Sequence, residues 1–213
     1  MKYPNAANGI NKIFMSEVIA LAASIVVLVC SVIGVLCFED PDLEILVGVL
    51  VIIVLFALGF FVLAYILQIV GIMRASKDEP AFKVSVIAII AAMIFTVLEG
   101  VFYGNHFASF FVEIAGDVAQ FFLVHYIIHG IMHIADHLER PDMIKKGNFI
   151  FRIIYIAIAF EVIVRIFELI FGKEVGEQLS MPFGIVAEIL KVAEYVMFLT
   201  YVGKANKMMK NAD

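Results

Sequence analysis

The sequence predicts an all-α, polytopic membrane protein with six transmembrane helices, arranged as three helical hairpins, and with both termini in the cytoplasm. Three observations predict this class: the composition, six long apolar runs, and the positions of lysine and arginine. Of the 213 residues, 63% are hydrophobic and 16% charged, and the mean hydropathy is +1.04. Soluble domains are about 45–50% apolar and about 25% charged. The composition therefore excludes an ordinary cytosolic enzyme, and a net charge of -5 offers no basic surface for nucleic acid.

Six continuous apolar runs define the expected spans, and each is long enough to cross the hydrocarbon core as a helix. The prolines give independent support, because all five fall outside these runs, where helix ends are expected. In the first run, small residues recur at every fourth position (Ser16, Ala20, Ser24), which predicts the close approach of another helix. The expected spans are 14–37, 45–73, 84–103, 108–135, 149–171 and 183–203.

Basic residues set the expected orientation. Twelve of the 15 lysines and arginines fall on the side of the chain termini: Lys2, Lys12, Arg74, Lys77, Lys83, Arg140, Lys145, Lys146, Arg152, Lys204, Lys207 and Lys210. The opposite side carries Lys173 among acidic residues: Glu39, Asp40, Asp42, Glu44, Glu174 and Glu177. Because lysine and arginine concentrate in cytoplasmic loops, both termini are expected to be cytoplasmic. We expect an integral protein of a bacterial cytoplasmic (inner) membrane.

The chain is expected to form a single transmembrane domain over 1–213. It divides into three segments of similar length, 12–80, 81–146 and 147–213, each predicted to leave and return to the cytoplasmic side. Residues 60–68 resemble residues 121–129, which favours internal repeats. Chance similarity between apolar segments of low complexity is the competing explanation.

Ionisable side chains inside the later spans are the feature most indicative of function. Each such charge costs about 2.5–3.5 kcal/mol at the bilayer centre, so these groups cannot face lipid. Within each span they recur at helical spacing, three, four or seven residues apart, which places them on one face. We therefore expect four polar stripes that meet as a polar core among the third to sixth spans. The residues are Glu99, Glu113, Asp117, Gln120, Glu161, Arg165, Glu168, Glu188, Lys191 and Glu194.

The charge balance of this polar core predicts a cation site. Arg165 can pair with Glu161 or Glu168 on its own helix, and Lys191 with Glu188 or Glu194. Such a network is the structural alternative, but it leaves most of the seven acidic residues without a base. The surplus must be protonated, hydrated or matched by a bound cation. The sequence thus predicts binding or transport of a cationic solute, a metal ion or protons, with Arg165 and Lys191 as counter-ions.

Four histidines at four-residue spacing provide a second hypothesis. His125, His129 and His133 share a broad face of the fourth span with Asp136, and His137 follows. Histidine is the commonest metal ligand and titrates near neutral pH. The ladder therefore suggests a divalent-metal or haem site of a membrane-embedded enzyme, or a proton relay. The structural alternative is a polar face whose inner end reaches the cytoplasmic surface.

A third hypothesis is a non-catalytic interaction protein. No motif in the chain names a reaction, which favours a role other than catalysis. In length, six spans and cytoplasmic termini, the chain resembles the substrate-binding subunits of energy-coupling-factor vitamin transporters. That resemblance is one of architecture alone, so no family is assigned. It implies a larger membrane complex; a homo-oligomer within the lipid bilayer is the other expected assembly.

Overall fold

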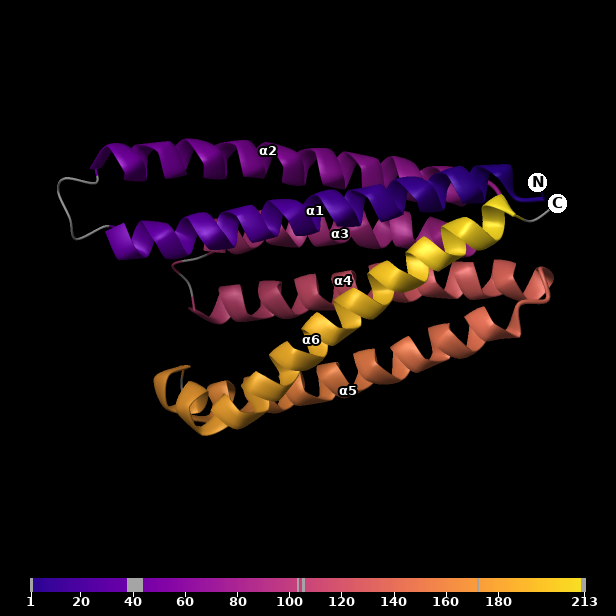
Figure 1. Cartoon of the computed structure of the whole chain (residues 1–213). Coiled ribbons are helices and arrows are strands. Elements are labelled where there is room, and N and C mark those ends of the chain that lie inside the picture. Colours follow the sequence, from indigo (N-terminus) through magenta and orange to yellow (C-terminus); the bar gives the residue numbers. More distant parts are fainter. Residues whose placement is uncertain (1, 38–43, 103, 105, 172, 212–213) are drawn as a thin grey trace.

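The protein is all-helical, as the sequence predicts. The computed structural model describes residues 2–37, 44–102, 104, 106–171 and 173–211; Glu39, Asp40, Pro41 and Asp42, used above in the sequence argument, lie outside these ranges. The described residues form six helices (Figure 1): α1 (Pro4–Cys37), α2 (Glu44–Ala75), α3 (Ala81–Phe102), α4 (His106–His137), α5 (Pro141–Phe171) and α6 (Lys173–Lys210).

Four of the described helices, α1 to α4, are long and apolar enough to cross a membrane. Most side chains in their apolar stretches face outward: Leu36 is 77% exposed, Phe56 71% and Ile87 69%. Soluble monomers rarely expose continuous apolar surface of this extent. The helices therefore indicate a membrane protein. The apolar stretches of α5 and α6 are interrupted by the charged residues of the polar stripes.

All six helices begin before the predicted spans, three of them by eight to ten residues. The sequence placed starts at 14, 149 and 183, whereas α1 begins at Pro4, α5 at Pro141 and α6 at Lys173. The hydropathy signal marks only the apolar part of a helix, and helical hydrogen bonding continues into the polar flanks. Pro182 was expected to precede the last span and instead lies inside α6. Proline is tolerated within helices of membrane proteins, where neighbours compensate for the missing N–H.

Consecutive helices pair as three hairpins: α1 with α2, α3 with α4, and α5 with α6. α6 crosses the bundle diagonally, so that it lies on α5 at one end and reaches α1 near the chain termini (Figure 1). The turn from α4 to α5 is short. Glu139 adopts a left-handed φ of 53°, and the Arg140 N–H donates to the Ala135 carbonyl at 2.8 Å, as in a Schellman motif. Whether the hairpins are repeats stays a prediction.

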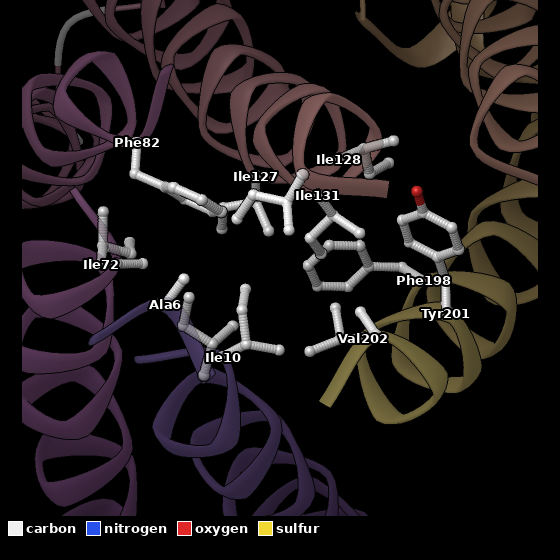
Figure 2. Close-up of a cluster of buried hydrophobic side chains, with 14 of the residues drawn as sticks. Ala6, Ile10, Ile72, Phe82, Ile127, Ile128, Ile131, Phe198, Tyr201 and Val202 are labelled. Atoms are coloured by element: carbon white, nitrogen blue, oxygen red, sulfur yellow. The ribbon is translucent and has the colours of Figure 1, made fainter. Parts of the chain in front are cut away.

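The buried core lies at the end of the bundle that holds both termini. Figure 2 shows Ile10, Ile72, Phe82, Ile131 and Val202 from five helices converging there. In α5 the buried residues end at Ala157, and in α1 only Ala23 and Cys30 are buried beyond Ser16. The six helices are thus packed together at one end, while toward the other end the buried contacts become sparse.

Polar contacts also stabilise the end of the bundle that holds both termini. The Asp78 carboxylate, in the turn between α2 and α3, accepts the Ala6 N–H and the Asn5 side-chain N–H, each at 2.8 Å. It thereby caps the start of α1, whose first N–H groups have no partner within the helix. The Asn206 side chain donates to Asn11 at 2.8 Å and ties α6 to α1. Side chains far apart in sequence therefore hold the two ends of the chain together.

Candidate functional site: an acidic cavity among α4, α5 and α6

The polar stripes of three helices line one cavity of about 370 Å³. α4 contributes Asp117 and Gln120, α5 contributes Glu161, and α6 contributes Lys191 and Glu194. The cavity begins at the edge of the core, because Ile154 and Phe198 belong to both. The remaining lining is apolar or aromatic: Phe121, Val124, Ala157, Ile158 and Tyr195. Charged residues that are costly against lipid thus face a shared open cavity.

The two basic residues bridge helices. Arg165 on α5 reaches α4, with Nη1 3.2 Å from Glu113 Oε2 and Nη2 2.5 Å from Asp117 Oδ2. Lys191 on α6 forms an ion pair with Glu161 on α5, and its Nζ lies 3.5 Å from Glu188 Oε1 on its own helix. The expected pairing of Arg165 within α5 is therefore wrong, and Lys191 has the expected partner Glu188 together with an unexpected one.

These bridges leave one carboxylate of the cavity without a counter-ion. Glu194 lines the cavity, and in the described part of the chain it forms no ion pair, since Lys191 pairs with Glu161 and Glu188. Glu161 shares Lys191 with Glu188. The cavity therefore keeps an excess of acid after both bases have been assigned.

A second cavity of about 190 Å³ adjoins the first. It holds Glu99 from α3 and Glu113 from α4, with Thr96 and Tyr65 beside them. Asp117 and Gln120 line both cavities, so they stand between the two. Of the ten residues assigned to the polar core from sequence, seven line one of the two cavities. Arg165 and Glu188 form ion pairs with lining residues, and Glu168 does neither in the described part of the chain.

A polar link that the sequence pattern did not predict joins the cavity wall to the first hairpin. The Tyr195 hydroxyl donates to the Glu17 backbone carbonyl at 2.9 Å, and the Gln68 amide donates to Glu17 Oε1 at 2.9 Å. Glu17 and Gln68 were each visible as isolated polar residues in apolar spans. Their pairing was not, because it depends on how α1 and α2 are rotated toward each other.

The four regularly spaced histidines of α4 contact different neighbours. The His125 ring stacks on Phe151 of α5, with centroids 4.5 Å apart, whereas His129 is exposed. His133 Nδ1 lies 2.6 Å from Glu79 Oε2 in the turn before α3. Among the described residues, no three His, Cys, Asp or Glu side chains gather to hold a metal ion. The set of His125, His129, His133 and Asp136 therefore does not form the ligand cluster that a divalent metal needs.

The contact between His133 and Glu79 is expected to be structural. The Glu79 side chain is 8% exposed, and besides His133 it accepts the Ala81 N–H at 3.1 Å. Replacing His133 with phenylalanine leaves a buried carboxylate short of one partner, which costs about 1–3 kcal/mol. Denaturation followed by circular dichroism should show this loss. His129→Phe, at an exposed position of the same helix, is the matched control, and equal losses in both variants would contradict the assignment.

Comparison with protein-family models, with curated proteins and with solved structures gave no match. Function is therefore inferred from the geometry of the cavities.

Proposed function

We propose that the chain is a six-span integral protein of a bacterial inner membrane, with cytoplasmic termini, that binds or transports a cation through the acidic cavity. The observation that carries the proposal is the convergence of three polar stripes on one cavity with an excess of acid. The same convergence supports spans for α5 and α6, because their charged faces turn toward other helices and leave apolar faces for lipid.

The charge of the cavity favours a cation as ligand. Asp117 and Glu161 are each paired with a base, and Glu194 is the carboxylate left over at the wall. A carboxylate in a site of reduced water content is stabilised by an opposite charge. A bound cation supplies that charge beside Glu194, and Lys191 limits the total charge that the cavity accepts.

The size and walls of the cavity favour a small organic cation over a bare metal ion. A volume of about 370 Å³ is within the roughly 300–1,000 Å³ typical of small-molecule sites. Phe121, Tyr195 and Phe198 are among the lining residues, and aromatic side chains attract cations. A divalent metal instead requires several close oxygen ligands, and no such group of three gathers among the described side chains.

The test is calorimetric binding of tetraethylammonium to the purified full chain in detergent. We expect wild-type protein to bind it and Glu194→Gln to bind at least about tenfold more weakly, since a loss of about 1.4 kcal/mol is a factor of ten. Glu168→Gln is the matched control: it removes an acid from the same set of helices, but from outside the cavity lining. It should keep the wild-type affinity.

Competition with tetraethylammonium distinguishes among an organic cation, an inorganic cation and protons as ligands. Displacement of tetraethylammonium by Na⁺ or Mg²⁺ would indicate an inorganic cation, and displacement by acid alone would indicate protons. Absence of binding by wild-type protein, with no stabilisation by any cation tested, would reject the proposal and favour the non-catalytic packing role. Equal weakening in Glu194→Gln and Glu168→Gln would place the ligand elsewhere.

A further inference from the structure

A different cavity lies between α5 and α6, at the end of the bundle near the chain termini. It measures about 530 Å³ and adjoins a smaller one of about 270 Å³, with which it shares Asp142, Lys146 and Lys204. It shares no lining residue with the acidic cavity. Its walls are Phe149 and Ile150 from α5 and Val196, Met197, Thr200 and Tyr201 from α6.

The rim of this cavity is strongly basic. Across the two adjoining cavities the charged lining residues are Arg140, Asp142, Lys145, Lys146, Lys204 and Lys207. Arg140 Nε lies 3.1 Å from Asp142 Oδ1, and this guanidinium holds the pKa of the Asp142 carboxyl below its ordinary value. Arg140 and Asp142 thus neutralise each other. In the described part of the chain, Lys145, Lys204 and Lys207 form no ion pair, so their positive charge is available to a ligand.

The groove below the rim is apolar and open to the outside. Phe149 is 55% exposed and Val196 is 56% exposed, although both line the cavity. Lys145 and Phe149 are four residues apart on α5, and Val196, Thr200 and Lys204 are each four apart on α6. Such spacing places them on the same helix face. Each helix therefore carries a lysine at the rim and an exposed apolar side chain below it, toward the bilayer.

We propose that this groove between α5 and α6 binds an anionic phospholipid. The phosphate lies among Lys145, Lys204 and Lys207, and an acyl chain lies along Phe149 and Val196. Basic pockets between transmembrane helices on the cytoplasmic side are suited to acidic headgroups, and the positive charge here contrasts with a chain of net charge -5. Free phosphate would match the rim but would leave the exposed apolar groove beneath it uncovered. A lipid matches both parts.

The chain contains no tryptophan, which allows a direct test with a single fluorescent reporter. Phe149→Trp places one indole in the groove of the full chain, and lipids with brominated acyl chains quench indole at contact. In mixed vesicles of equal brominated content, we expect brominated phosphatidylglycerol to quench more strongly than brominated phosphatidylcholine. The attraction of three lysines for an acidic headgroup predicts a preference on the order of tenfold or more in relative association constant. Phe56→Trp, on the exposed face of α2, should show no preference.

Neutralising the lysines of the rim tests whether they bind the headgroup. In the Phe149→Trp background, Lys145→Gln, Lys204→Gln and Lys207→Gln together should abolish the preference. Lys2→Gln, Lys77→Gln and Lys83→Gln remove the same number of lysines elsewhere on that end and should preserve it. Equal quenching by the two lipids, or equal losses in both triple variants, would overturn the proposal. Relief of quenching by millimolar glycerol phosphate would assign the rim to a free phosphate ligand and reject the lipid.

Discussion

Replacing Gly9 with alanine is expected to lower the free energy of unfolding by about 2 kcal/mol, because α1 and α2 touch backbone to backbone at this residue. A Cβ on Gly9 would lie 2.4 Å from the Gly71 carbonyl oxygen and 2.7 Å from the Ala75 nitrogen. Neither atom belongs to a flexible side chain, so the helices themselves must separate. Alanine also gains about 1 kcal/mol in helix propensity over glycine, which offsets part of the cost.

The measurement is denaturation of the purified protein in detergent, followed by loss of helical circular dichroism. Gly48→Ala is the matched control, because a Cβ there meets nothing within 4 Å. It should leave stability unchanged or raise it slightly. Gly71→Ala should behave like Gly9→Ala, since its Cβ would lie 2.8 Å from the Gly9 carbonyl oxygen. Equal stability of Gly9→Ala and Gly48→Ala would show that the two helices are not in this close contact.

Replacing Arg165 with glutamine is expected to destabilise the protein by about 1–3 kcal/mol, because it leaves two carboxylates of α4 without their base. The Arg165 side chain is 20% exposed, and its partners Glu113 and Asp117 are 45% and 49% exposed. Water therefore screens part of the interaction, which keeps the expected loss below that of a fully buried pair. The stability of Arg165→Lys should lie between those of the wild type and Arg165→Gln, because a single ammonium replaces a guanidinium that reaches both Glu113 and Asp117.

A second variant separates the ion pair from other effects of the substitution. Adding Glu113→Gln and Asp117→Asn to Arg165→Gln removes the unpaired charges and should recover most of the loss, as in a mutant cycle. Arg152→Gln, at an exposed position of the same helix, should change stability by less than about 0.5 kcal/mol. If Arg165→Gln and Arg152→Gln unfold at the same denaturant concentration, the ion pairs between α4 and α5 contribute nothing measurable to stability.

Periodicity and hydropathy were enough to predict the helices and the faces on which their polar residues lie. The seven-residue recurrence of Glu113 and Gln120 around Asp117 places all three on one side of α4, and these three side chains line the two cavities. Partners across helices could not be predicted. Whether Arg165 bonds Glu161 on its own helix or Asp117 on another depends on the rotation of α5 against α4, and spacing along one helix contains no information about that rotation.

The small residues of α1 illustrate the same limit. Ser16, Ala20 and Ser24 predicted the close approach of another helix, and of the three Ser16 is buried whereas Ser24 is exposed. A backbone-to-backbone approach that the pattern did not indicate lies at Gly9 and Gly71. Small residues allow close approach wherever they occur. The site at which it happens is decided by the convergence of all six helices at the end with the termini, which is a property of the whole bundle.

The buried hydrophobic core holds the helices together mainly at the end of the bundle near the chain termini. The rise of 1.5 Å per residue puts Phe171, the last residue of α5, about 20 Å beyond the buried Ala157. That part of α5 is held by other contacts: Arg165 pairs with Glu113 and Asp117 of α4, and Glu161 pairs with Lys191 of α6. Asp117, Glu161 and Lys191 also line the acidic cavity. The charges of the cavity therefore also hold the outer half of α5 against its neighbours, where the buried aliphatic core no longer does.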